Sequence, residues 1–131
     1  TDMFEKKIIV GIAGYDSPFT FIWDQDGVNC IVKGIATEYS GAFNLAGDGV
    51  LSMKEMAKIL KKPYLPIPLA AIKYGLKILK KVGLTQYGPE QTLFLQYRPV
   101  LSNENLKAKF KYIPKKTTKE TFMYYLSGQN Q

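Results

Sequence analysis

The residues with the clearest binding chemistry are Tyr97 and Arg98, which follow a predicted helix and precede Pro99. Arg98 is the only arginine in this chain of 131 residues. A guanidinium binds two phosphate oxygens at once through parallel hydrogen bonds, whereas a lysine ammonium acts as a point charge. The pair is therefore a candidate site for a diphosphate, with an ordinary surface position for Arg98 as the alternative.

Most other catalytic arrangements are excluded or incomplete. The chain has no histidine and a single cysteine, Cys30, which rules out Ser-His and Cys-His nucleophile systems, a multi-cysteine zinc site and an internal disulfide. Asp24 and Asp26 are close in sequence, and two carboxylates can bind a hard cation. Acids are nevertheless more common at the start of a helix, where they interact favourably with its dipole. We predict no catalytic and no metal-binding residues.

Two short patterns imitate motifs of dinucleotide enzymes. Gly11 and Gly14 follow a predicted strand, but the third glycine of a phosphate-binding turn is missing, and no capped helix follows to supply the required N-terminus. Tyr112 and Lys116 are four residues apart, as in a proton-transfer pair that needs a helix to place both side chains on one face. Pro114 lies between them and disfavours that helix. We therefore predict no cofactor-binding residues.

The spacing of apolar, β-branched and turn residues predicts a helix-rich α/β chain with a small mixed sheet and several helices, forming a single domain over residues 1–131. Strands are expected over residues 6–12, 19–22, 42–46 and 64–67. Helices are expected over residues 24–37, 52–61, 69–82, 89–97, 102–110 and 117–126. The pairs Ser52 with Glu55 and Thr117 with Glu120 have the spacing of capping boxes, which favours helix starts at these positions.

Two of the expected helices are amphipathic. In the helix over 24–37, one face is defined at helical spacing by Val28, Ile31, Val32 and Ile35. In the helix over 69–82, one side carries Lys73, Lys77, Lys80 and Lys81, and the other carries Leu69, Ile72, Leu76, Leu79 and Val82. The second pattern fits either a helix lying on an anionic membrane or a solvated lysine face over a buried apolar face, and we favour the solvated face.

The formal net charge of +7 attracts phosphates, nucleic acids and anionic lipids without distinguishing them. Lysines over residues 107–119 interleave with Phe110 and Tyr112, as on some nucleic-acid surfaces, but no nucleic-acid motif accompanies them. No apolar run reaches the roughly 20 residues that cross a bilayer, and the amino terminus lacks the pattern of a secretory signal. We expect no nucleic-acid partner, disfavour a membrane partner and expect a cytoplasmic location.

Three stretches carry a family resemblance. Residues 21–28 (FIWDQDGV) look like a strand that turns into a helix, with Trp23 where the family usually has histidine. Residues 43–49 (FNLAGDG), followed by 51–56 (LSMKEM), look like a strand that leads into a Ser-capped helix. Residues 101–120 look like a closing helix and loop before a last helix. In this order they resemble the carboxy-terminal part of the extended short-chain dehydrogenases, which include nucleotide-sugar epimerases, dehydratases and reductases.

This chain departs from the family pattern at two positions. Only Asp26 is kept from the family's acidic pair, and Lys111 replaces a usual glycine. The resemblance implies that the chain forms the substrate side of a nucleotide-sugar cleft, beside a missing N-terminal Rossmann domain that holds NAD(P) and the catalytic residues. It implies substrate-binding roles for Arg98, Tyr97 and Trp23.

We therefore expect the substrate-binding carboxy-terminal portion of an NAD(P)-dependent nucleotide-sugar epimerase or dehydratase, inactive by itself. A steroid or isoflavone reductase relative would change only the substrate. Loss of the Rossmann partner would expose an apolar face, so a homodimer or strand exchange is also expected. The alternative from another class is a non-catalytic basic module that binds an anionic membrane or a polyanion through its lysine-rich helices.

Overall fold

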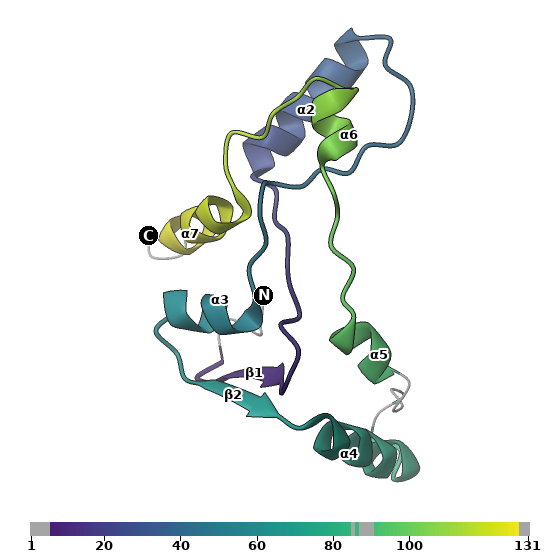
Figure 1. Ribbon diagram of the computed structural model, residues 1–131, viewed down its shortest axis with the longest axis vertical. Helices are drawn as coiled ribbons and strands as arrows, with labels where there is room; N and C mark the ends of the chain where they lie inside the picture. The colour runs from purple at the N-terminus through teal and green to yellow at the C-terminus, as the bar shows by residue number, and fades with distance from the viewer. Residues whose placement is uncertain (1–5, 85, 87–90, 129–131) are drawn as a thin grey trace. The chain divides into compact units, whose positions relative to one another are not determined.

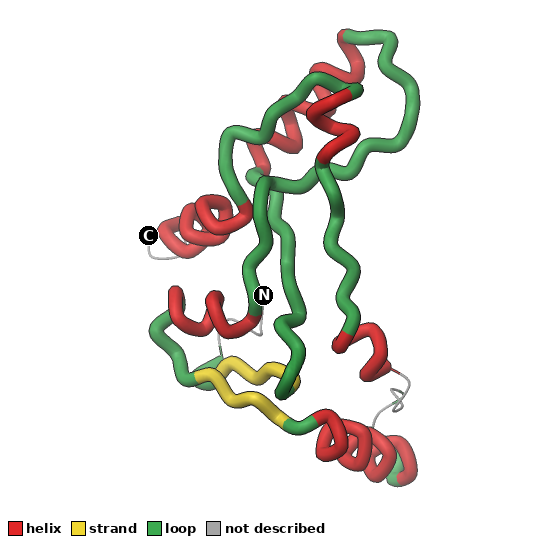
Figure 2. The backbone as a smooth tube through the Cα atoms, in the orientation of Figure 1, coloured by secondary structure: helices red, strands yellow, loops and turns green. Residues whose placement is uncertain are grey.

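The computed structural model describes residues 6–84, 86 and 91–128, and the chain forms two compact units (Figure 1). Unit 1 comprises Thr1–Pro18 and Ser52–Pro99, and unit 2 comprises Phe19–Leu51 and Val100–Gln131. Each unit is therefore assembled from two separate stretches of sequence. The expected α/β class is confirmed, because helices and a small sheet make up the regular structure (Figure 2). The single domain over residues 1–131 stays a prediction.

Unit 1 contains the sheet. Its elements in chain order are β1 (Ile9–Ile12), α3 (Met53–Ile59), β2 (Tyr64–Ile67), α4 (Leu69–Lys81) and α5 (Gln91–Gln96). The two strands are parallel, with Ile9 opposite Tyr64, so the sheet in the described residues is parallel and not mixed as expected. α3 packs against both strands and buries Met56 and Ala57 with Ile9 and Ile12. This apolar layer is the core of unit 1.

Unit 2 contains α2 (Asp24–Ala36), α6 (Glu104–Ala108) and α7 (Thr118–Gly128). Its core cluster joins Cys30 of α2 to Leu106 and Phe110. A second apolar contact is aromatic: the Phe21 ring stacks on Phe122, with ring centroids 5.7 Å apart and planes at 16°. Stacked rings add attraction beyond the area that they bury, so this contact fixes α7 against the segment that precedes α2.

Both predicted capping boxes are confirmed. The Ser52 hydroxyl accepts the Glu55 N–H at 3.2 Å, and the Glu55 carboxylate accepts the Ser52 N–H at 2.8 Å. The same pair of bonds joins Thr117 and Glu120, at 3.2 and 2.8 Å. These bonds satisfy N–H groups that have no partner within a helix, which is why α3 and α7 begin where the sequence predicts.

Two of the four expected strands, the second and the third along the chain, do not form. The second makes one isolated antiparallel bridge, between Phe19 and Leu51, and one further backbone bond, from the Gly47 N–H to the Phe21 carbonyl. The N–H of Phe21 binds the Thr118 hydroxyl, at 3.4 Å, instead of a strand. The prediction is wrong here because apolar alternation indicates an extended segment but does not supply the neighbouring strand that must pair with it.

The apolar face predicted for α2 is exposed. Between 51% and 83% of each side chain on it is accessible to solvent: Val28, Ile31, Val32 and Ile35. The buried side instead carries Asp26 and Cys30, which lie one helical turn apart. An apolar helix face at this spacing normally packs on a core, so in this chain it is a surface without its cover.

α4 also departs from the favoured interpretation. Its lysines are exposed, as expected, but no residue of the helix is buried. On the opposite side Leu69, Ile72 and Leu76 are half-buried, whereas Leu79 and Val82 are exposed. No helix in the described part of the chain is long and apolar enough to cross a membrane.

The remaining helices begin close to their predicted starts. Pro89, expected in the first turn of α5, lies outside the described residues. Asn103, and not Ser102, is the N-cap residue of α6, although the Ser102 hydroxyl accepts the Glu104 N–H at 3.3 Å. α5 therefore ends at Gln96, just before the Arg98-Pro99 break that the sequence indicates, and α6 begins after it, at Glu104.

Candidate functional site

Tyr97 and Arg98 lie in unit 1, directly after α5. Tyr97 is 68% exposed and Arg98 is half-buried. The Tyr97 ring meets the Tyr15 ring edge to face, with centroids 5.8 Å apart and planes at 83°. A hydrogen bond with Tyr97 raises the pKa of Tyr15 above its ordinary value, so the Tyr15 phenol stays neutral near pH 7. The site therefore offers two hydroxyl groups beside the only guanidinium of the chain.

Tyr15 is positioned by the loop that follows β1. Gly14 in this loop has φ +82°, in the left-handed region that favours glycine, and it turns the chain after the strand. The sequence interpretation missed Tyr15, because 82 positions separate it from Tyr97 and no local pattern links them. A tyrosine three residues after a predicted strand end was the available signal.

Trp23 lies in unit 2, at the N-cap of α2. The Lys116 ammonium lies 4.6 Å from the Trp23 ring centroid and 5.3 Å from the Tyr124 ring centroid. The two rings meet edge to face at 5.7 Å. A cation held over aromatic faces gains electrostatic attraction, and its remaining N–H groups can still bind an anion. The Trp23 indole N–H is buried and, within the described residues, has no hydrogen-bond partner.

Asp26 holds Lys116 in place. Its carboxylate is completely buried and accepts the Tyr112 hydroxyl at 2.7 Å. It also accepts the N–H groups of Lys115, at 2.9 Å, and Lys116, at 3.4 Å. Burial, followed by the bond to this carboxylate, raises the pKa of Tyr112. Asp26 therefore fixes the loop before α7 and, through it, the position of the ammonium over Trp23.

Asp26 could have been recognised from the sequence. It lies one turn before Cys30 and two turns before Gly34, whose Cβ position faces Phe110 at 3.8 Å. An acid that shares a helix face with small residues is as consistent with a buried carboxylate as with an exposed acid at the helix start. The resemblance drew attention to Asp26, but nothing in the sequence identified its partners.

The residues of the other candidate motifs do not form the arrangements that those motifs require. Tyr112 and Lys116 are not in a helix, and they contact different partners, Asp26 and Trp23. Gly11 lies in β1 and Gly14 in the loop that follows it, and no helix begins between Gly14 and Asp24. Asp24 is exposed and accepts the adjacent Gln25 N–H, so its environment differs from that of buried Asp26. The described residues contain no cluster of three or more potential metal ligands.

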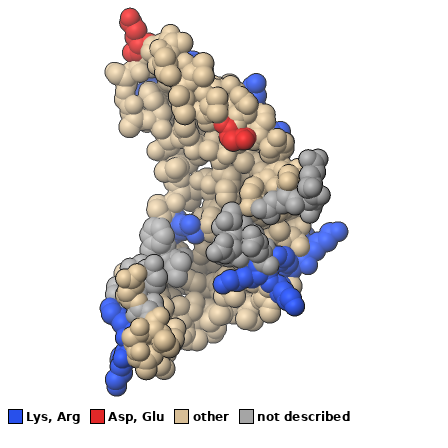
Figure 3. All heavy atoms as spheres, turned by 180° about the vertical axis from the view of Figure 1, so that it is seen from behind, with Lys and Arg blue, Asp and Glu red and all other residues tan. Residues whose placement is uncertain are grey.

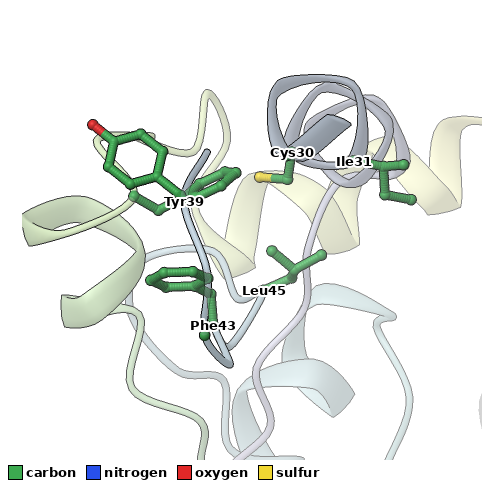
Figure 4. Close-up of a pocket in the computed structure, with 8 residues that line it drawn as sticks. Cys30, Ile31, Tyr39, Phe43 and Leu45 are labelled. Atoms are coloured by element: carbon green, nitrogen blue, oxygen red, sulfur yellow. The ribbon is translucent and has the colours of Figure 1, made fainter. Parts of the chain in front are cut away.

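Unit 2 also contains an apolar pocket of about 260 Å³ (Figure 4). Cys30 points from α2 toward the loop that carries Tyr39 and Phe43, and the Tyr39 hydroxyl is directed away from it (Figure 4). Burial raises the pKa of the Cys30 thiol, which keeps it protonated near neutral pH. A protonated, buried thiol is a poor nucleophile, so this pocket suits an apolar group and not covalent chemistry.

Comparison of the chain with protein-family models, with curated proteins and with solved structures gives no match.

Acid is expected to weaken unit 2 through Asp48. Its carboxylate pairs with the Lys107 ammonium and accepts the Asn103 amide at 2.8 Å, and these bonds hold its pKa below the ordinary value. A folded-state pKa below the unfolded one means that the contribution is present above about pH 4 and is lost as the pH falls through the folded pKa. Urea unfolding of Asp48→Asn should therefore depend less on pH in this range.

The control for this prediction is Glu104→Gln, which removes one exposed acid from neighbouring α6. It should keep the acid dependence of the parent chain. Equal dependence in the parent and in Asp48→Asn would show that the Lys107 and Asn103 bonds do not stabilise the folded state.

Proposed function

We propose that this chain is the substrate-binding carboxy-terminal portion of an NAD(P)-dependent nucleotide-sugar epimerase or dehydratase. Its cofactor and its catalytic residues would be supplied by an N-terminal Rossmann domain outside these residues. In the intact enzyme, the nicotinamide would exchange a hydride with the sugar. The chain alone would bind no dinucleotide and would be inactive, and its compartment would be the cytoplasm.

The observation that carries the proposal is the contact between the three stretches that resemble the family. Gly47, from the second stretch, donates its N–H to the Phe21 carbonyl of the first stretch at 2.7 Å. Thr118, near the end of the third stretch, donates its N–H to the Asp48 carbonyl of the second stretch at 2.8 Å. The three stretches, which are distant in sequence, thus contact one another. This supports the resemblance, because unrelated matches would have no reason to meet.

The exposed face of α2 supports a missing partner. Four large apolar side chains at positions 28, 31, 32 and 35 cover one helix face, and covering them would remove apolar surface from water. We infer that the Rossmann domain packs there in the intact enzyme. Without it, the same face would bring two copies of the chain together as a homodimer.

The proposed ligand contacts are Arg98 and Tyr97 in unit 1 and Trp23 in unit 2. Arg98 would clamp the diphosphate, for which its two parallel donors are suited. Tyr97 would donate its hydroxyl hydrogen bond to the same group. Trp23 would present the accessible part of its ring, next to the ammonium of Lys116. Each role requires only a polar contact and no proton transfer, which fits the absence of a predicted base.

Uridine diphosphate is a suitable probe of these contacts. We expect weak binding to the full chain in calorimetry, and we expect Arg98→Ala to weaken it about tenfold because a charge-assisted bond is lost. Lys119→Ala, an exposed lysine of α7, is the matched control and should change nothing. No binding of the diphosphate, or equal loss in both variants, would contradict the substrate role.

The missing half has its own test. NAD and NADP should show no stoichiometric binding to the chain. The reading frame upstream of Thr1 should encode a Gly-x-x-Gly-x-x-Gly turn and a Tyr-x-x-x-Lys pair, which hold the pyrophosphate and move the proton. Tight dinucleotide binding to these residues, or an upstream frame without either motif, would refute the proposal.

A further inference from the structure

The positive charge of this chain is concentrated in one stretch. Residues 56–89 contain seven of the 18 basic residues and none of the 11 acidic ones. The other 11 basic residues equal the acids in number, so this stretch carries the whole net charge of +7. In unit 1, the part that bears α4 shows lysines and no acidic side chain on the face seen in Figure 3.

α4 combines this charge with exposed apolar side chains. Tyr74 and Ile78 of α4 and its C-cap residue Val82 are spaced four residues apart and therefore lie on one side of the helix, and they are 69%, 63% and 61% exposed. We call them the α4 stripe. Lys77 and Lys81 immediately flank it on one side. The half-buried residues Ile72 and Leu76 flank it on the other, where α4 packs within unit 1.

We propose that the α4 stripe binds the surface of an anionic lipid bilayer, with α4 lying in the plane of the membrane. The proposal is independent of the enzymatic role proposed above. The apolar side chains would enter the boundary between headgroups and acyl chains, and the lysines would extend to lipid phosphates. Tyr74 suits this boundary, because its ring is apolar and its hydroxyl is polar.

The combination of features favours lipid over the other anionic partners. A nucleic-acid backbone would attract the lysines but would leave the α4 stripe in water. The exposed face of α2 is equally apolar, but α2 contains one lysine, Lys33, and two acids, Asp24 and Asp26. The two helices therefore differ in charge. A helix of 13 residues spans only about 20 Å, too short to cross a hydrocarbon core of about 30 Å, and so suits the membrane surface.

Vesicle sedimentation of the full chain tests the proposal. At low salt the chain should sediment with vesicles in which a third of the lipid is phosphatidylglycerol and the rest phosphatidylcholine, and not with pure phosphatidylcholine. Binding should fall about tenfold or more at high salt, since the attraction to lipid phosphates is screened. Failure to sediment with the anionic vesicles at low salt would overturn the proposal.

Two pairs of variants separate a surface site from general charge. Ile78→Glu should weaken binding about tenfold, because it places a carboxylate in the apolar stripe. Ile31→Glu, on the α2 face and 61% exposed, should leave it unchanged. Lys77→Glu with Lys81→Glu should abolish binding, whereas Lys109→Glu with Lys119→Glu makes the same change in net charge outside the stretch and should retain most of it.

The folding of each variant and the specificity of its binding are measured together with vesicle binding. Circular dichroism and Trp23 fluorescence should match the parent chain for each variant that is compared. Equal losses in the two lysine pairs would mean that net charge alone acts. If Ile78→Glu binds vesicles as well as the parent chain does, and the chain binds a single-stranded oligonucleotide as strongly as the vesicles, the surface binds polyanions in general. Either outcome overturns the lipid proposal.

Discussion

Replacing Asp26 by alanine is expected to lower the free energy of unfolding of unit 2 by about 3 kcal/mol, because three buried or partly buried donors lose their acceptor at once. These donors are the Tyr112 hydroxyl and the N–H groups of Lys115 and Lys116. A charged acceptor makes stronger bonds than a neutral one, and its removal leaves the donors unsatisfied. Urea unfolding followed by the fluorescence of Trp23, the only tryptophan, measures the loss in unit 2.

The matched control is Asp24→Ala. Asp24 is in the same first turn of α2, but it is exposed, and its carboxylate bonds only to the adjacent Gln25 N–H among the bonds described. Its replacement should cost less than about 1 kcal/mol. Asp26→Asn, which keeps the size of the side chain, should fall between the two. A loss below 1 kcal/mol for Asp26→Ala would mean that water replaces the carboxylate and that Asp26 does not organise the loop.

The helices could be predicted because their signals are local. The hydroxyl of Ser52 and the carboxylate of Glu55 are three residues apart, and this spacing alone specifies the start of α3. The same holds for Thr117 and α7. Pro63 and Pro68 likewise delimit β2, since proline cannot donate to a strand ladder. In each case a few neighbouring residues contain the physical cause.

What could not be predicted depends on distant residues. An amphipathic pattern identifies an apolar face, but it does not say that this chain has anything to cover it, which is why the apolar side of α4 is less buried than expected. The second expected strand fails for the same reason. The Tyr15 and Tyr97 contact and the Asp26 bonds to Tyr112 join residues more than 80 positions apart. No spacing rule reaches so far, so the composition of each candidate site was only partly predicted.

The candidate ligand residues show the same division. Arg98 was selected by its side-chain chemistry and Trp23 by resemblance, and both choices rest on residue type. The structure adds Lys116, held over Trp23 by Asp26, whose position no type or spacing indicated. A carboxylate in the first turn of α2 thus determines where the Lys116 ammonium lies in unit 2.

Replacing Gly47 by alanine is the second large expected effect, about 2 to 3 kcal/mol of lost stability in unit 2. A Cβ at this position would lie 2.7 Å from the Phe21 carbonyl oxygen, 2.9 Å from the Lys116 carbonyl oxygen and 3.0 Å from the Thr118 nitrogen. All three contacts are with backbone atoms, which cannot rotate away as a side chain can. The segments would have to separate, which strains the bond from the Gly47 N–H to Phe21.

Gly27→Ala in α2 is the control for this effect, because no heavy atom lies within 4 Å of its Cβ position. There alanine should stabilise unit 2 by about 0.5 to 1 kcal/mol, since it favours the helix. Opposite signs for two glycine-to-alanine changes in one unit would locate the effect in the close approach at Gly47. If Gly47→Ala costs no more than 1 kcal/mol, the three segments can separate without loss, and the contact that supports the proposed family role is not a structural requirement.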